Sequence, residues 1–101
     1  MAEATLGVCV VGAGAMGRNH VRAWSQVEGA RLVALADLDE SRSGPLAAEY
    51  GIENVYTDYR CAVDRADVDI VSVCVPAYFH PEVTIFGAAH GKHVLCEKPI
   101  A

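Results

Sequence analysis

Short apolar runs alternate with longer amphipathic stretches along the whole chain. The runs Leu6–Val11, Leu32–Ala36 and Val71–Val75 consist mainly of aliphatic residues, and small or polar residues follow each of them. Near-continuous apolar runs are typical of strands that are buried on both faces of a parallel sheet. The pattern predicts strands over residues 6–11, 31–36, 55–56, 69–75 and 94–97.

Residues that commonly begin or end helices lie between these runs. Gly51 is suited to the end of a helix, and Thr57 or Asp58 to the cap at the start of one. His80 and Pro81 suit the cap and the first residue of another helix, which would end before Gly91. We therefore expect helices over residues 15–28, 40–50, 59 to about 66, and 81 to about 89.

Strands that alternate with helices favour an α/β fold with a parallel sheet and right-handed crossovers. At 101 residues the chain forms one domain at most. A doubly wound nucleotide fold commonly has six strands, whereas about five are predicted here, and Ala101 follows the fifth almost at once. We expect either a truncated part of a longer polypeptide or a minimal domain that covers an open sheet edge in another way.

A glycine motif stands between the first predicted strand and the first predicted helix. Its residues are Gly12-Ala13-Gly14-Ala15-Met16-Gly17. In a strand–turn–helix, the first glycine permits the tight turn, the second lets the backbone approach a pyrophosphate, and the third lets the helix pack closely on the strand. The helix N-terminus then offers amide groups and a positive dipole end to the phosphates. This placement predicts a Rossmann-type dinucleotide site.

An acidic residue completes the pattern. Asp37 lies 20 positions after Gly17, at the end of the second apolar run. A carboxylate there can accept hydrogen bonds from both hydroxyls of the adenine ribose. The alternative is that Asp37 caps a helix that starts near Asp39 or Glu40. No Lys or Arg occupies positions 38–41, which favours NAD over NADP, although Arg42 keeps NADP open as the less favoured cofactor.

Charge and cysteine usage exclude several other classes. The formal net charge is −5 with no basic run, so neither nucleic acid nor an anionic membrane is an expected partner. No secretory signal or membrane span is visible. Cys9, Cys74 and Cys96 fall within apolar runs, and we expect them to be inert core thiols in a reducing cytoplasm. His20 is expected to be packed, and His90 and His93 lack the further ligands that a metal site needs.

Three motifs together point to a family. Cys96-Glu97-Lys98-Pro99, the run Gly12 to His20 and Val75-Pro76-x-x-x-His80 resemble the glucose–fructose oxidoreductase, inositol dehydrogenase and rhizopine-catabolism family. The resemblance covers the whole chain as the N-terminal cofactor domain of that family. It implies that Gly12, Ala13, Gly14, Met16 and Gly17 surround the pyrophosphate, that Asp37 and Leu38 face the adenine ribose, that Val75, Pro76 and His80 lie near the nicotinamide, and that Glu97 lies near the nicotinamide ribose.

The resemblance also implies a chemistry. Lys98 would lie at the reaction centre of an oxidoreductase that transfers a hydride between NAD and a secondary alcohol of a polyol, sugar or cyclitol. The bland alternative for Lys98 is a solvated side chain after a strand. The substrate domain of the family has no counterpart in this sequence, so a non-catalytic dinucleotide-binding module is the competing hypothesis. We also expect the chain to self-associate through surface that later sequence would cover.

Overall fold

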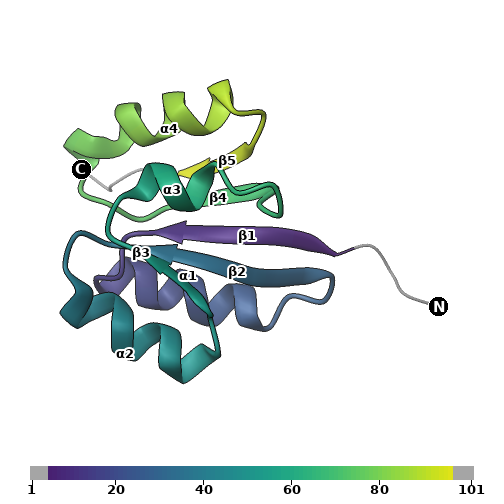
Figure 1. The fold of residues 1–101 in the computed structure, drawn as a ribbon, viewed down its shortest axis with the longest axis vertical. Helices are drawn as coiled ribbons and strands as arrows, with labels where there is room; N and C mark the ends of the chain where they lie inside the picture. Colours follow the sequence, from purple (N-terminus) through teal and green to yellow (C-terminus); the bar gives the residue numbers. More distant parts are fainter. Residues whose placement is uncertain (1–4, 97–101) are drawn as a thin grey trace.

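The structure, a computed structural model, describes residues 5–96 of the chain. Its strands form a five-stranded sheet in the order β3-β2-β1-β4-β5, and all neighbouring strands are parallel (Figure 1). The strands are β1 (Leu6–Val11), β2 (Ala30–Ala36), β3 (Asn54–Tyr56), β4 (Ile70–Val73) and β5 (His93–Cys96). The predicted parallel α/β sheet of the Rossmann type is therefore confirmed.

The helices cover both faces of the sheet. Helices α1 (Ala15–Ser25) and α2 (Glu40–Tyr50) lie on one face, and α3 (Tyr59–Val63) and α4 (His80–Ala89) lie on the other (Figure 1). A short 3₁₀ turn, η1 (Ala77–Phe79), leads directly into α4. The chain winds outward from β1 to β3 and then returns to place β4 on the other side of β1, so the order of the strands reverses between β1 and β4.

Alternating residues of β1 supply two separate cores. Cys9 and Val11 pack into the cluster under α3 and α4, whereas Val8 and Val10 pack into the cluster under α1 and α2. All four side chains are at most 3% exposed. A strand that is buried on both faces needs apolar residues at successive positions, which explains the uninterrupted apolar run in the sequence.

Three predicted elements are shorter than expected, namely α1, β4 and α3, and the last of these ends at Val63 rather than near residue 66. Helix α1 ends at Ser25 rather than at residue 28, because the chain must turn at Gly29 (φ 86°) to enter β2. Strand β4 ends at Val73 rather than at residue 75. The amide of Cys74 still donates to the Val11 carbonyl, but the pairing of β4 with β1 ends at Val11 and Val73, because β1 turns away at Gly12.

The predicted starts of α1, α2 and α3 match the structure, whereas the start of α4 does not. Helix α2 spans the predicted residues 40–50 and is followed by Gly51, and Asp58 caps α3 by accepting a hydrogen bond from the Arg60 amide. His80 was expected to cap α4, and that prediction is wrong. The preceding turn η1 already has helical geometry, so Phe79 takes the cap position without a side-chain bond and His80 is the first residue of α4.

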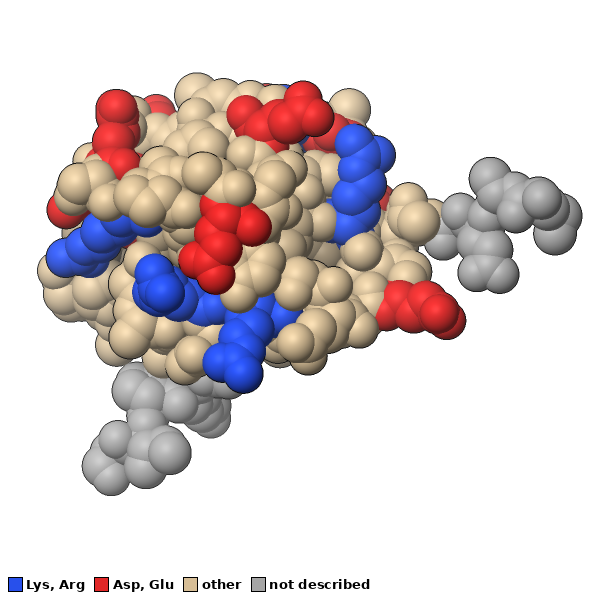
Figure 2. All heavy atoms as spheres, turned by 90° about the horizontal axis from the view of Figure 1, so that it is seen from below, with Lys and Arg blue, Asp and Glu red and all other residues tan. Residues whose placement is uncertain are grey.

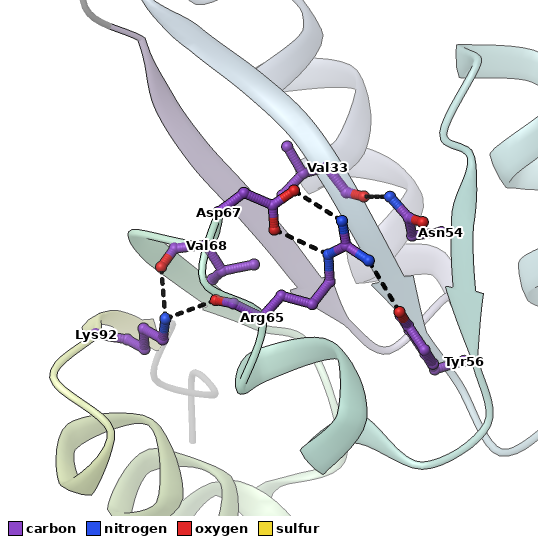
Figure 3. Close-up of polar contacts among 7 residues, drawn as sticks. All are labelled: Val33, Asn54, Tyr56, Arg65, Asp67, Val68 and Lys92. Carbon is purple, nitrogen blue, oxygen red and sulfur yellow. Dashed lines mark hydrogen bonds and ion pairs between the residues drawn. The ribbon is translucent and has the colours of Figure 1, made fainter.

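A polar network fixes the loop between α3 and β4 (Figure 3). Arg65 donates two hydrogen bonds to the Asp67 carboxylate, at 2.8 and 2.7 Å, and one to the Tyr56 hydroxyl at 3.0 Å. Lys92 Nζ donates to the carbonyls of Arg65 and Val68, each at 2.8 Å. The side chain of Lys92 thereby ties the segment before β5 to the segment before β4, which aligns the two strands at their starts.

The surface carries charges of both signs. Lys and Arg side chains are interspersed with Asp and Glu over the lower face of the molecule in the orientation of Figure 1 (Figure 2). Within residues 5–96, no helix combines the length and apolar character that a membrane crossing requires.

Candidate functional site

A large cleft opens at the carboxyl ends of the strands. Its volume is about 1340 Å³, above the roughly 300–1,000 Å³ of common small-molecule pockets. In open parallel sheets, ligands bind at this edge beside the point where the strand order reverses, which here lies between β1 and β4. Of the residues predicted to bind a cofactor, the cleft is lined by Gly12, Gly14, Met16, Asp37, Leu38, Val75 and Pro76.

Two of the three motif glycines are required by the backbone itself. Gly12 has a φ of 107°, and a Cβ built on it would lie 2.5 Å from the Cys74 carbonyl oxygen. A Cβ on Gly17 would overlap the Gly12 carbonyl. These glycines let the loop after β1 pass close to β4 and let α1 pack on that loop. Both are therefore needed whether or not the cleft holds a ligand.

Gly14 differs from the other two because none of the residues that the structure describes crowds it. A Cβ there would have only Arg42 Nη1 within 4 Å, at 3.8 Å. Gly14 occupies the N-cap position of α1, which no side chain caps. The amides of Ala15, Met16 and Gly17 precede the first intrahelical bond, from the Arg18 amide to the Gly14 carbonyl, and so have no intrahelical acceptor. Because Ala15 and Met16 line the cleft, the loop presents open backbone donors there.

Ala13 holds the glycine loop in place through contacts within the protein. Its side chain is 3% exposed and packs into the core. Its amide donates to Asp37 Oδ2 at 2.6 Å, and it does not line the cleft. Gly17 likewise lies outside the cleft lining. The family resemblance implied that both surround the pyrophosphate, whereas the structure gives them contacts within the protein. The glycine pattern itself assigned Gly17 to close packing of the helix, and the structure agrees.

Asp37 is held at the cleft by two backbone amides. Besides the bond from Ala13, its Oδ1 accepts the Asp39 amide at 2.7 Å. The cap of α2 is Asp39, whose carboxylate accepts the Ser41 amide. The alternative that Asp37 caps this helix is therefore wrong. Each carboxylate oxygen of Asp37 uses one lone pair in these bonds, which leaves acceptor capacity facing the cleft.

Positive charge reaches the same part of the cleft from α2. Arg42 lines the cleft and its Nε lies 3.6 Å from Asp39 Oδ2. Hydrogen bonds from Ser41 hold the pKa of Asp39 below its ordinary value, so the partner of Arg42 stays ionised. Because one carboxylate already partly balances Arg42, the guanidinium is only partly available to a ligand phosphate.

The other end of the cleft is formed by the loop after β4. Val75 and Pro76 line it, together with Phe79 from η1. His80 does not line it. Instead its Nε2 lies 2.7 Å from the Val75 carbonyl oxygen, and its Nδ1 lies 3.1 Å from Cys96 Sγ. Glu97 and Lys98 lie outside the described residues, one and two positions after the end of β5.

Sequence reasoning missed one wall of the cleft, which residues 57–60 and Glu82 form. The Tyr59 hydroxyl donates to Glu82 Oε2 at 2.9 Å. Burial and the Glu82 carboxylate raise the pKa of Tyr59, so the phenol remains protonated and keeps this bond. For residues 57–60 the available signal was their position directly after β3, because the ends of parallel strands meet at one edge. Glu82 lies in α4 and carried no such signal.

Comparisons with known proteins agree on one family. Residues 6–101 match the profile of the oxidoreductase family, NAD-binding Rossmann fold. The chain is 43% identical to inositol 2-dehydrogenase 1 of Saccharopolyspora erythraea, covering 96% of this chain and 29% of that protein. It is 33% identical to D-apiose dehydrogenase of Paraburkholderia graminis, covering 91% of this chain and 24% of that protein.

Solved structures give the same result. The apo scyllo-inositol dehydrogenase of Lactobacillus casei superposes with a TM-score of 0.91 at 30% identity, covering 98% of this chain and 30% of that one. The same enzyme with bound NAD(H) and scyllo-inositol superposes with a TM-score of 0.88, covering 94% of this chain and 28% of that one. The chain spans about 29% of the length of the inositol dehydrogenases it matches. With this fold and this profile, the chain belongs to the oxidoreductase family with an NAD-binding Rossmann fold.

Proposed function

We propose that residues 1–101 form the dinucleotide-binding domain of an NAD-dependent oxidoreductase that acts on a secondary alcohol of a cyclitol, sugar or related polyol. The observation that supports this most directly is Gly14, where a Cβ would project into the cleft and meet only Arg42. A glycine that the fold does not require, at the start of a helix with open amides, fits the close approach of a pyrophosphate.

The residues of the cleft suit the parts of NAD in order. The amides at the start of α1 would hold the pyrophosphate, and Asp37 would accept hydrogen bonds from the adenine ribose. Leu38, which is 81% exposed, would cover the adenine side. Val75 and Pro76 would lie beside the nicotinamide, and Glu97 beside its ribose. Bound NAD supplies the hydride acceptor for the oxidation of an alcohol.

Lys98 would act on the substrate oxygen. Its ammonium would stabilise the alkoxide that develops as the hydride leaves, and it could relay the proton of the hydroxyl. Since the chain spans about 29% of its inositol dehydrogenase relatives, the substrate pocket and turnover are proposed for a protein that includes a substrate domain. The polyol class is taken from the relatives that bind or oxidise inositols. The cytoplasmic location inferred from cysteine usage stays a prediction.

The cofactor assignment is tested by calorimetry with NAD(H) and NADP(H). We expect tighter binding of NAD(H), because the Asp37 carboxylate would repel a 2′-phosphate and Arg42 is partly balanced by Asp39. Asp37→Ala should weaken NAD binding by about tenfold, which corresponds to the loss of one hydrogen bond to a charged group. It should also reduce the preference for NAD(H) over NADP(H). Glu53→Ala, which removes the same charge outside the cleft, serves as the control.

Two outcomes would contradict this assignment. A clear preference for NADP(H) in the unmodified protein would show that Arg42 dominates the site. If the ratio of NAD(H) affinity to NADP(H) affinity is unchanged in the Asp37→Ala variant, Asp37 only supports the loop through its hydrogen bonds with Ala13 and Asp39. A protein that binds NAD but turns over no polyol, even with its substrate domain present, would favour the non-catalytic binding module.

A further inference from the structure

The cysteines of the chain occupy very different surroundings. Cys9 and Cys74 are buried, and burial raises the pKa of the Cys9 thiol to about 12, so Cys9 stays a protonated core residue. Cys61 is exposed on α3, and within residues 5–96 its thiol forms no hydrogen bond. Cys96 was expected to be an inert core thiol like Cys9. It is instead only half-buried at the end of β5.

Cys96 is paired with an imidazole of defined tautomer. Its Sγ lies 3.1 Å from His80 Nδ1, and the opposite ring nitrogen, Nε2, lies 2.7 Å from the Val75 carbonyl oxygen. A carbonyl oxygen can only accept, so Nε2 must carry a hydrogen. In the neutral ring Nδ1 is then the acceptor, and the Cys96 thiol donates to it.

This arrangement is that of a nucleophile, a base and a group that orients the base. Transfer of the thiol proton to Nδ1 gives a thiolate beside an imidazolium. Both hydrogen bonds survive the transfer, because Nε2 still donates to Val75 and Nδ1 now donates to the sulfur. The thiolate is the reactive form of cysteine, and the Val75 carbonyl also stabilises the positive ring. The three groups come from β5, α4 and the loop after β4, so the fold holds them together.

We propose that Cys96 is a reactive thiol, activated by His80, and a site of reversible modification by small hydroperoxides. In the reaction, the thiol proton moves to His80 Nδ1 and a sulfur electron pair attacks one peroxide oxygen. The O–O bond breaks as the S–O bond forms, which oxidises the sulfur to a sulfenic acid. The departing oxygen takes the proton from His80, so that hydrogen peroxide is reduced to water.

In the unmodified protein, the reaction rates of Cys96 and Cys61 show whether activation by His80 or solvent accessibility determines reactivity. Cys61 is more exposed than Cys96, but within residues 5–96 no histidine forms a hydrogen bond with its thiol, so accessibility alone predicts faster reaction at Cys61. Activation by His80 predicts the reverse order. We expect Cys96 to react at least about tenfold faster than Cys61, a threshold below the roughly 100-fold that a positioned base typically contributes. The reaction needs no cofactor, so its result is independent of the proposed function.

The experiment treats the folded protein with limiting hydrogen peroxide, traps sulfenic acid with a cyclic diketone, and follows each cysteine by peptide mass spectrometry. Iodoacetamide provides a second probe, in which the sulfur forms the new C–S bond and iodide leaves. Equal or faster modification of Cys61 with both probes would overturn the proposal.

A His80→Gln variant tests the base itself. The glutamine amide can still donate to the Val75 carbonyl, but it cannot take up the thiol proton. We expect modification of Cys96 to slow to the rate of Cys61 or below, while the rate of Cys61 itself is unchanged. A Cys96 rate equal to that of the unmodified protein would overturn the role of His80. Labelling of the buried Cys9 would show that the His80→Gln variant has partly unfolded. In that case the relative rates of Cys96 and Cys61 in the unmodified protein decide whether the proposal holds.

Discussion

The three glycines of the loop after β1 differ in what an added Cβ atom would contact. At Gly12 and Gly17 an added Cβ would collide with backbone, so these residues serve the fold, whereas at Gly14 it would extend into the cleft. The sequence motif alone does not make this distinction, because all three positions are simply glycine. The structure therefore identifies one position at which binding and folding can be separated by substitution.

Gly14→Val is expected to abolish NAD binding and leave the fold intact. The extended backbone at Gly14 (φ −77°) is open to a β-branched residue, and the valine side chain would occupy the space that the pyrophosphate needs. Gly44→Val is the matched control, since nothing lies within 4 Å of a Cβ there and Gly44 does not line the cleft. Calorimetry measures binding, and circular dichroism measures folding. Near-normal affinity in a folded Gly14→Val protein would show that the phosphates bind elsewhere.

Lys98→Ala is expected to affect turnover far more than binding. In a protein that includes the substrate domain, kcat should fall on the order of 100-fold, as for the loss of one group that stabilises transition-state charge, while NAD affinity changes little. Lys98→Arg should not restore activity, because a guanidinium does not readily exchange a proton. Steady-state kinetics and calorimetry on the same variants test this. Retention of most of the kcat would assign Lys98 a structural role.

For helices and strands, the sequence predicted the bounds that local residues determine. It did not predict the bounds that depend on contacts between distant parts of the chain. The bounds of β1 and α2 match the prediction because apolar periodicity and the residues Asp39 and Gly51 define them. The end of β4 was misplaced because it depends on where β1 turns away. The sequence also did not predict the contacts of His80 or the approach of Arg42 to Gly14. Each of these joins residues that are far apart in the sequence, so no local pattern indicates them.

The network around Lys92 provides a test at this scale. Lys92→Met keeps the aliphatic stem but removes both hydrogen bonds to the carbonyls of Arg65 and Val68. We expect the free energy of unfolding to fall by about 1–3 kcal/mol, measured by urea denaturation, with NAD affinity unchanged. Arg22→Met, at an exposed position on α1, should change it by no more than about 0.5 kcal/mol. Equal effects of the two substitutions would show that the network adds nothing to stability.

The surface around β5 combines a sheet edge with exposed apolar side chains. In the part of the chain that the structure describes, strand β5 lies at the edge of the sheet and pairs only with β4. Large apolar side chains are exposed on this strand and on the neighbouring elements, with Leu95 46%, Ile85 68% and Tyr78 77% exposed. Exposed apolar groups beside an open strand edge favour association with another chain.

Light scattering should therefore show that the 101-residue chain associates as its concentration rises. Leu95→Lys, which places a charge on the edge strand, is expected to reduce this association. Leu6→Lys is the control, because Leu6 is 51% exposed but begins β1 at the centre of the sheet. A stable monomer at high concentration would contradict the expectation and favour a self-contained module.

The central position of β1 has a consequence for biosynthesis. Of the five strands of this sheet, β1 is translated before the others, and its β4 side is paired only by residues about sixty positions later, as the bond from the Gly7 amide to Asp69 Oδ2 illustrates at a separation of 62. A nascent chain can therefore pair β1, β2 and β3 early, but one edge of β1 and the apolar side chains of its second core stay exposed until β4 emerges. During translation, the strand that later carries the glycine loop is thus the one that most needs protection from aggregation.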